Sequence, residues 1–466
     1  MNVGNFDATD TVLVIGMGKS GLASVAVLRT RGVTVYATDE KPPAEIAEAI
    51  SSVERAGGRF IAGADLDALL AKLTLAVLSP GVPLTSRVVR QVQAHNVPVF
   101  GEIEVAYRLC KAPIVAVTGT KGKSTTTALI GHLLRACGKT VFVGGNIGNP
   151  LIREIGDAGS GDWVVAEVSS FQLETIRSFK PRAAVLLNIA PDHLDRYHSM
   201  EEYAEAKYRI FANQSADDYF VGNLDDGRIA ALQSGGSEHR MRSKQLWFTQ
   251  RDRHGAATMY VHDGSLTYAP PWGDPRPRTL LRSADIPLPG GHNVLNVMAA
   301  MLAALAVGCD PIDVCRALAS FRPMPHRLES VGEIDGVLYV DDSKATNPGS
   351  VVAALRSFNR PVVLIAGGRS KGTDFTELGV AIRQRAKALV VIGEAATEIA
   401  RVSNGVAAWQ EASMADAVLR ARHLAAPGDV VVLSPGCASF DMFASAEDRG
   451  ERFAAAVDAL RERAGA

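Results

Sequence analysis

The 466-residue sequence has few cysteines and no marked excess of either charge. Its five cysteines are scattered and odd in number, without a close pair at zinc-ligand spacing, which argues against a disulfide scaffold or a zinc finger. The formal net charge of −1 gives no reason to expect a nucleic-acid partner. These absences favour a protein of a reducing compartment whose partners are small molecules.

The sequence also lacks a long hydrophobic run and a secretory leader. Its longest helical apolar stretch, residues 297–307, is too short to span a bilayer and predicts a buried core helix. The N-terminal segment has neither the basic nor the apolar part of a signal peptide. We therefore expect a cytoplasmic protein with no membrane insertion.

What the sequence does contain is a recurring pattern of strand, glycine turn and helix. Short β-branched runs open three groups of this pattern, beginning at Val12, at Ile114 and near Val337. Parallel sheets wound with crossover helices have this pattern. A chain of 466 residues also exceeds what one hydrophobic core usually supports.

We therefore predict an α/β fold of three domains. A Rossmann-like domain is expected in residues 1–104, a central P-loop ATPase-like parallel sheet in 105–323, and a second Rossmann-like domain in 324–466. The polar stretch 234–282 predicts an antiparallel excursion or a loop insertion. Polar residues follow many of the predicted strands directly, and open α/β sheets bind ligands at these carboxyl ends.

The clearest motif is a strand, a glycine loop and a helix start in residues 114–126, with Thr-Gly-Thr-Lys-Gly-Lys-Ser at 118–124. Backbone N–H groups of such a loop hold phosphate oxygens, Lys123 would neutralise them, and the Ser124 hydroxyl would bind Mg²⁺. A simple helix cap after a glycine turn is the alternative. We expect ATP to be bound here by Gly119, Thr120, Lys121, Gly122, Lys123, Ser124 and Thr125.

Candidate metal ligands follow the next two predicted strands. Glu167 ends one strand, and a cluster with Asp192 and His193 follows the other, with Lys207 on a helix beyond. Carboxylates are preferred Mg²⁺ ligands. Taken alone, the Asp/His cluster also fits a metallohydrolase, and Lys207 also fits a solvated helix lysine.

These motifs, in this order, resemble those of the Mur ligases, and most closely the D-glutamate-adding branch. The resemblance rests on the phosphate loop, Glu-Val-Ser-Ser-Phe-Gln-Leu-Glu at 167–174, Asp-His-Leu-Asp-Arg-Tyr at 192–197 and Ala-Lys-Tyr-Arg-Ile at 206–210. It implies that CO₂ forms a carbamate on Lys207 and that two Mg²⁺ ions are bound. The implied metal ligands are Ser124, Glu167, His193 and Lys207, and the implied catalytic residues are Lys123, Glu167, His193 and Lys207.

The resemblance also implies further nucleotide contacts outside the phosphate loop. The run Gly-Gly-His-Asn-Val-Leu-Asn at 290–296 would contact the adenine; a helix N-cap is the alternative, and both can hold together. The implied residues are His292, Asn293, Asn296, Arg327 and Asp342.

The first predicted domain carries a dinucleotide-type pattern, Gly16-x-Gly18-x-x-Gly21, with Asp39 at the end of the next strand. A nicotinamide dehydrogenase is one reading of this pattern. The resemblance implies instead that the domain holds the UDP end of a precursor. The implied residues are Gly16, Gly18, Ser20, Gly21, Asp39, Glu40, Lys41, Ser79, Gly81, Asn146, Ser169 and His193.

The last predicted domain contains Asp-Asp-Ser-Lys at 341–344 and Ser-Pro-Gly-Cys-Ala-Ser-Phe at 434–440, which resemble the same branch. The implied D-glutamate ligands are Lys344, Thr346, Lys371, Ser439 and Phe440, and two lysines suit a dicarboxylate. The expected reaction joins D-glutamate to UDP-N-acetylmuramoyl-L-alanine through an acyl phosphate, in peptidoglycan biosynthesis, in a monomer. A folate-type polyglutamylating ligase and a non-catalytic nucleotide-binding regulator are the alternatives.

Overall fold

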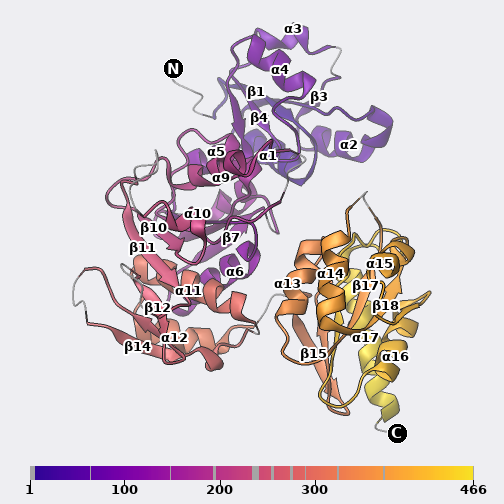
Figure 1. The fold of residues 1–466 in the computed structure, drawn as a ribbon. Helices are drawn as coiled ribbons and strands as arrows, with labels where there is room; N and C mark the ends of the chain where they lie inside the picture. The colour runs from indigo at the N-terminus through magenta and orange to yellow at the C-terminus, as the bar shows by residue number, and fades with distance from the viewer. Residues whose placement is uncertain are drawn as a thin grey trace. The chain divides into compact units, whose positions relative to one another are not determined.

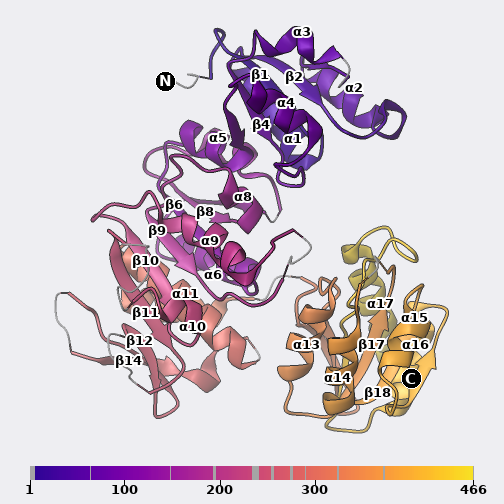
Figure 2. The same ribbon diagram turned by 45° about the horizontal axis from the view of Figure 1, so that its top comes forward.

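The computed structural model describes residues 6–62, 65–146, 148–192, 196–233, 241–252, 257–272, 276–288, 290–322, 325–370 and 373–464. The chain forms two compact units, one of Met1–Ile286 with Val294–Phe321 and one of Pro287–Asn293 with Arg322–Ala466. The first unit contains two β-sheets and the second contains one (Figure 1, Figure 2). The predicted α/β class with three sheets is confirmed, and the three domain boundaries stay predictions.

The first sheet has five parallel strands in the order β3-β2-β1-β4-β5. In its central strand, Val12 and Val14 enter one hydrophobic core and Leu13 and Ile15 enter another, so both faces of the sheet are covered. Helices α1, α2 and α5 contribute to the first core, and α3 and α4 to the second. The elements are β1 (Thr11–Ile15), α1 (Lys19–Thr30), β2 (Thr34–Thr38), α2 (Ala47–Arg55), β3 (Arg59–Phe60), α3 (Asp67–Leu70), β4 (Leu75–Leu78), α4 (Arg87–Ala94), β5 (Val99–Gly101) and α5 (Glu102–Leu109).

The second sheet has nine strands in the order β14-β13-β12-β11-β10-β9-β6-β8-β7. Its strands are parallel from β7 to β12, and β12-β13-β14 form an antiparallel meander, which confirms the antiparallel excursion predicted in 234–282 for the residues described there. The strands are β6 (Ile114–Thr118), β7 (Val141–Gly145), β8 (Trp163–Glu167), β9 (Ala183–Leu186), β10 (Tyr219–Asn223), β11 (Lys244–Thr249), β12 (Met259–His262), β13 (Ser265–Tyr268) and β14 (Arg278–Arg282). The helices are α6 (Lys123–Ala136), α7 (Leu151–Glu154), α8 (Ser170–Glu174), α9 (Met200–Tyr208), α10 (Gly227–Ala230), α11 (Gly291–Ala306) and α12 (Pro311–Ser320).

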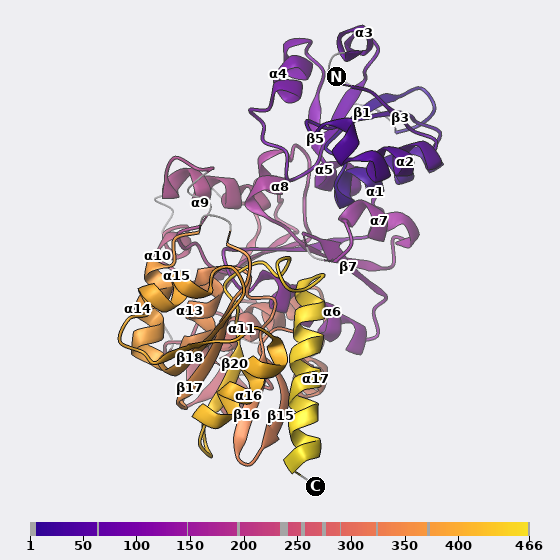
Figure 3. The ribbon, with the colours of Figure 1, turned by 90° about the vertical axis from the view of Figure 1, so that its right-hand side faces the viewer.

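The third sheet has the order β15-β16-β20-β17-β18-β19, with only its edge strand β15 antiparallel. Helices α13, α14 and α15 pack on one face and α16 and α17 on the other, as Figure 3 shows. The elements are β15 (Glu329–Ile334), β16 (Val337–Asp341), α13 (Pro348–Arg356), β17 (Val362–Gly367), α14 (Thr376–Arg385), β18 (Ala386–Ile392), α15 (Ala396–Val402), β19 (Ala408–Gln410), α16 (Met414–Leu424), β20 (Val430–Leu433) and α17 (Ala446–Ala464).

Helix α5 joins the first sheet to the second. Its Glu104 is fully buried, and the carboxylate accepts hydrogen bonds of 2.9 Å from the backbone N–H groups of Arg177, Ser178 and Phe179, which follow α8. Burial alone would raise the pKa of Glu104, but hydrogen bonds from the Ser178 side chain, the Arg177 N–H and the Arg108 side chain hold this pKa below its usual range. A buried carboxylate with so many donors therefore fixes the joint between the two sheets. In the part of the chain that the structure describes, we find no helix with the length and apolar character needed to cross a membrane.

Candidate active site

The phosphate loop lies between β6, in the interior of the second sheet, and α6. Gly122 ends the loop with φ +84°, a conformation that favours glycine, and a Cβ there would lie 2.2 Å from Oδ1 of Asn296. The loop is held from the end of β9 by Asn188. Asn188 Oδ1 accepts from the Lys121 N–H at 2.8 Å, and its Nδ2 donates to the Lys121 carbonyl at 2.9 Å.

Two lysines converge on the backbone of this loop. Lys123 Nζ donates to the carbonyl oxygens of Gly119 and Thr120, each at 3.0 Å, and Lys207 Nζ donates to the Gly119 carbonyl at 3.0 Å. The Lys207 side chain is buried, and its ammonium lies 4.4 Å from the centre of the Tyr203 ring. The structure therefore brings together two residues that the sequence places on separate helices.

The surroundings of Lys207 disfavour its charged form. Burial lowers the pKa of Lys207 to about 7 from its usual value of 10.5, the charge of Lys123 lowers it further, and Asp192 opposes the shift. Near neutral pH a large fraction of this side chain is therefore an uncharged amine, which can act as a nucleophile.

Glu167 ends β8 beside the phosphate loop, because it pairs in register with Val117 of β6. Its Oε1 accepts from Asn146 Nδ2 at 2.9 Å, and its Oε2 is buried without a hydrogen-bond partner among the described residues. A buried carboxylate oxygen left over in this way fits a hard cation such as Mg²⁺. Ser124 is also buried, at the start of α6. The other two predicted metal ligands are Lys207, described above, and His193, which lies outside the described residues.

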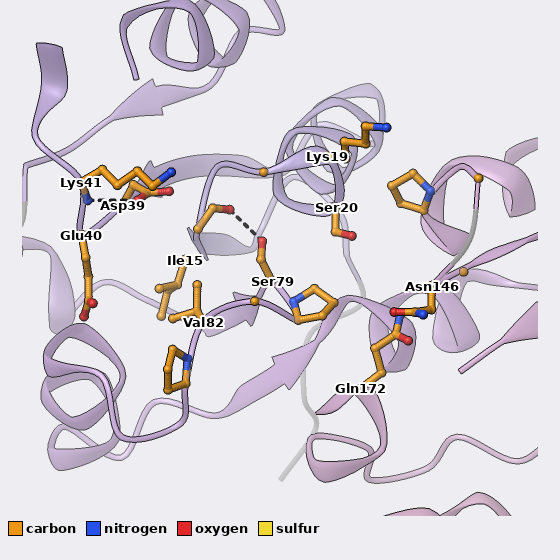
Figure 4. Close-up of a pocket in the computed structure, with 18 residues that line it drawn as sticks. Ile15, Lys19, Ser20, Asp39, Glu40, Lys41, Ser79, Val82, Asn146 and Gln172 are labelled. Carbon is orange, nitrogen blue, oxygen red and sulfur yellow. Dashed lines mark hydrogen bonds between the residues drawn. The ribbon is translucent and has the colours of Figure 1, made fainter. Parts of the chain in front are cut away.

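A cavity of 510 Å³ lies at the carboxyl ends of the first sheet and extends to the second (Figure 4). In Figure 4, Asp39, Glu40 and Lys41 lie on one side of it, and Asn146 and Gln172 on the other. The predicted UDP-site residues that line it are Gly16, Gly18, Ser20, Asp39, Glu40, Lys41, Ser79, Gly81 and Asn146.

Two other predicted residues of this set do not line the cavity but shape it. A Cβ on Gly21 would lie 1.9 Å from the Gly16 carbonyl oxygen, so Gly21 permits α1 to pack against the turn. Ser169 caps α8 through a capping box with Gln172. Asp39 also has a local role, because its carboxylate accepts from the N–H groups of Met17 at 2.7 Å and Lys41 at 3.1 Å.

In the second compact unit, a buried arginine organises the loops that carry the predicted D-glutamate ligands. Arg449 is fully buried and donates to Ser343 Oγ at 2.9 Å, to the Ser343 carbonyl at 2.8 Å and to the Cys437 carbonyl at 3.1 Å. Ser343 precedes Lys344, and Cys437 lies two residues before Ser439. Arg449 therefore connects the two loops.

The predicted ligands on these loops differ in exposure. Ser439 is buried, whereas Thr346 is exposed and Phe440 is 62% exposed, as suits a side chain that could contact a ligand. Lys344 Nζ lies 2.5 Å from Oε1 of Glu447. Lys371 lies outside the described residues.

The predicted ATP residues outside the phosphate loop divide between the two units. Asn296 lies beside Gly122 in the first unit, whereas His292, Asn293, Arg327 and Asp342 belong to the second. Burial raises the pKa of Asp342 to about 7, while hydrogen bonds from Ser434 and the Leu328 N–H oppose the shift.

Comparison with known proteins gives matches along most of the chain. Family models match at residues 10–101 (Mur ligase MurD-like, N-terminal domain), 117–304 (Mur ligase middle domain) and 326–437 (Mur ligase, glutamate ligase domain). A UDP-N-acetylmuramoylalanine–D-glutamate ligase of Pelotomaculum thermopropionicum is 43% identical over 454 residues, 97% of this chain and 98% of the relative. The chain belongs to the Mur ligase family. The ligase of the same name from Geotalea daltonii is 42% identical over 450 residues, with 96% of this chain and 97% of the relative covered.

Solved structures of Mur ligases and of a pseudomurein peptide ligase share the fold. A pseudomurein peptide ligase of Methanothermus fervidus has a TM-score of 0.59 at 17% identity, covering 97% of this chain and 100% of its own. A UDP-N-acetylmuramate–alanine ligase of Thermotoga maritima has a TM-score of 0.58 at 20% identity, covering 97% and 99%. A further Mur ligase of Thermotoga maritima, solved in complex with ADP, has a TM-score of 0.55 at 19% identity, covering 85% and 92%.

Three residues that the sequence motifs contain, but to which the sequence alone assigns no role, have clear roles in the structure. Asn188 clamps the phosphate loop, Arg449 connects two loops of the second unit, and Gln172 lines the cavity. The position of Asn188 directly after a strand was the available signal for that residue. Arg449 has no such signal, because a fully buried arginine on a charged helix is indistinguishable from a solvated one in sequence.

Proposed function

We propose that this Mur ligase adds D-glutamate to UDP-N-acetylmuramoyl-L-alanine in peptidoglycan biosynthesis, consuming ATP and releasing ADP and phosphate. The names of its close relatives support this substrate pair. The structural observation that carries the proposal is the 2.9 Å hydrogen bond between Asn146 and Glu167. Asn146 lines the cavity and Glu167 lies beside the phosphate loop, so a precursor in the cavity can present its carboxylate to ATP.

Different residues of the chain would act in the two steps of the proposed reaction. The L-alanyl carboxylate attacks the γ-phosphate in line, the bond to the bridging oxygen breaks and ADP leaves, and the loop amides with Lys123 stabilise the negative charge on the transferred group. The amine of D-glutamate then attacks the resulting acyl phosphate, and phosphate leaves as the amide forms. Mg²⁺, held by Ser124, Glu167, His193 and Lys207, would supply further neutralisation of the phosphate oxygens. The second unit would hold D-glutamate through Lys344, Thr346, Lys371, Ser439 and Phe440.

We further propose that Lys207 is carbamylated. Its neutral amine adds to CO₂, one proton is released, and the side chain becomes an anion with two oxygens. The low pKa of Lys207, about 7, supports this step because only the uncharged amine has a free electron pair. Carbon-13 NMR with ¹³CO₂ should show one carbamate resonance that is absent in Lys207→Arg. The same resonance in that variant would refute the assignment.

An ADP-release assay tests the proposed substrates. UDP-N-acetylmuramoyl-L-alanine is paired in turn with D-glutamate, L-glutamate, L-lysine and meso-diaminopimelate. We expect turnover with D-glutamate alone, and equal turnover with another amino acid would overturn the assignment. We propose that the reaction takes place in the cytoplasm. We also propose that the active enzyme is a monomer, and sedimentation equilibrium of the active enzyme tests this oligomeric state.

A further inference from the structure

Glu102 is a buried carboxylate at the joint between the first two sheets, and the proposed reaction does not use it. It is the first residue of α5, directly after β5, and it is 1% exposed. Its Oε1 accepts from the Ile152 N–H at 2.7 Å. Its Oε2 is buried and has no hydrogen-bond partner of good geometry among the described residues, although the Gln172 side chain is near enough to lower the pKa of the carboxyl group. A buried carboxylate oxygen that is satisfied so weakly is costly and calls for an explanation.

The contacts of Glu102 lead to the wall of the cavity that the second sheet provides. Ile152 lies in α7, two residues after Pro150, and both Pro150 and Gln172 line the cavity. The Gln172 Oε1 is occupied by the Ser169 N–H at 2.9 Å, so its carboxamide NH₂ is the group left for Glu102 and for a ligand. A Cβ on Gly101 would lie 2.1 Å from Thr175 Oγ1, so the segments at this joint are packed too closely for a larger residue.

We propose that Glu102 is a positioning residue of the UDP-precursor cavity, and that it takes up a proton when the precursor binds. This inference rests on the proposed function. The Glu102 carboxyl group ties the start of α5 to α7 and to Gln172. In this way it sets the distance between the wall of the cavity that carries Asn146 and the glycine turn of the first sheet. The precursor brings an anionic diphosphate and a carboxylate into the cavity, and added negative charge near a buried carboxyl favours its protonated form.

The protonation of Glu102 is set by burial and not by a neighbouring charge. Burial raises the pKa of Glu102 to about 7, while the Ile152 N–H and the Gln172 side chain lower it. The charged groups on the surrounding segments have other partners or are exposed. Glu104 pairs with Arg108 on α5, Glu154 of α7 binds Asn149, and Glu174 of α8 binds Arg196. Arg153, Asp157 and Lys19 are exposed, and Lys19 of α1 also lines the cavity.

Isothermal titration calorimetry of UDP-N-acetylmuramoyl-L-alanine tests the proposal. The wild type, Glu102→Gln, Glu102→Leu and the exposed control Glu48→Gln are titrated at pH 7 in two buffers with different heats of ionisation, which gives the number of protons bound. The wild type and Glu48→Gln should take up part of a proton, and Glu102→Gln should take up less. Glu102→Gln keeps an acceptor for Ile152, so its affinity should stay within about threefold, whereas Glu102→Leu should bind about tenfold more weakly or worse.

The pH dependence and the kinetics separate positioning from a general loss of folding. Precursor affinity of the wild type should rise as the pH falls from 8 to 6, and that rise should be smaller in Glu102→Gln. In Glu102→Leu the KM for the precursor should rise while the KM for ATP stays unchanged. Equal proton uptake and equal affinity in all four proteins would overturn the role of Glu102. Absence of precursor binding by the wild type would instead overturn the proposed function.

Discussion

Two lysines in different parts of the molecule have opposite electrostatic surroundings. Lys207 of α9 is 1% exposed, and its Nζ contacts the Gly119 carbonyl at 3.0 Å. Lys344 follows β16 and its Nζ lies 2.5 Å from Oε1 of Glu447, which is exposed. Burial lowers the pKa of Lys207 to about 7, whereas the hydrogen bond from Lys344 lowers the pKa of Glu447 to about 2. The first lysine is poised to lose its proton, and the second is one half of an ion pair.

The difference matches the chemistry that we propose for each residue. A lysine that reacts with CO₂ must be an uncharged amine, and burial together with the nearby charge of Lys123 favours that form. A lysine that binds a substrate carboxylate must stay charged and must be reachable from solvent. The same residue type therefore serves two purposes, and its position in the fold selects between them. The predictions below test each side of this contrast.

The largest effect is expected when the reactive lysine is replaced. Lys207→Arg keeps a positive charge but cannot form a carbamate, so turnover should fall by about 10³-fold or more, as when a catalytic electrostatic group is lost. Steady-state ADP release measures the rate, and circular dichroism checks that the fold is retained. Turnover near that of the wild type would show that no carbamate is needed.

A smaller effect is expected at the charged lysine of the second unit. Lys344→Ala removes a charge-assisted hydrogen bond to the D-glutamate carboxylate, worth about 1.5–3 kcal/mol, or about 10- to 150-fold in KM for D-glutamate. The KM for ATP should not change. Lys387→Ala is a matched control, because Lys387 pairs with Asp429 at 2.6 Å and is assigned no ligand. An unchanged KM for D-glutamate would remove Lys344 from the site.

The protonation of Lys207 should also be visible as a pH dependence. With a pKa of about 7, about one tenth of the side chain is neutral at pH 6 and about nine tenths at pH 8. Carbamate formation also releases a proton, so both effects act in the same direction. At a fixed concentration of dissolved CO₂, the carbamate resonance should therefore grow at least about tenfold from pH 6 to pH 8. A signal that is flat or that falls with pH would contradict the assigned pKa shift.

The sequence was sufficient for the elements whose signal is local. The strand before the phosphate loop is a run rich in β-branched residues, and the positive φ at position 122 requires a glycine there. The glycine turn after β1 has the spacing of a dinucleotide-binding pattern. The polar residues at strand ends were found because parallel strands align their carboxyl ends. Most of the predicted UDP-precursor residues line the cavity for this reason.

What the sequence could not give is the set of contacts between distant segments. Asn188 bonds to the loop 67 residues before it, and Arg449 bonds to Ser343, 106 residues away. Glu102 and Glu104 stand on one helix turn, yet burial raises the pKa of Glu102 to about 7, while backbone and side-chain donors hold that of Glu104 below its usual range. Nothing in the local pattern distinguishes these two glutamates, because their donors come from α7 and from the turn after α8.

The smallest expected effect concerns the partner of Lys344. Glu447 occupies the ammonium that we assign to D-glutamate, so Glu447→Gln removes a competing carboxylate. Because a surface ion pair contributes about 0–1 kcal/mol, the KM for D-glutamate should fall by up to about fivefold. Asp448→Asn is the matched control, since Asp448 pairs with Arg452 at 2.9 Å and its loss should leave that KM unchanged. If Glu447→Gln instead raises the KM as far as Lys344→Ala does, Glu447 orients Lys344 for the substrate, and the ion pair is part of the binding site.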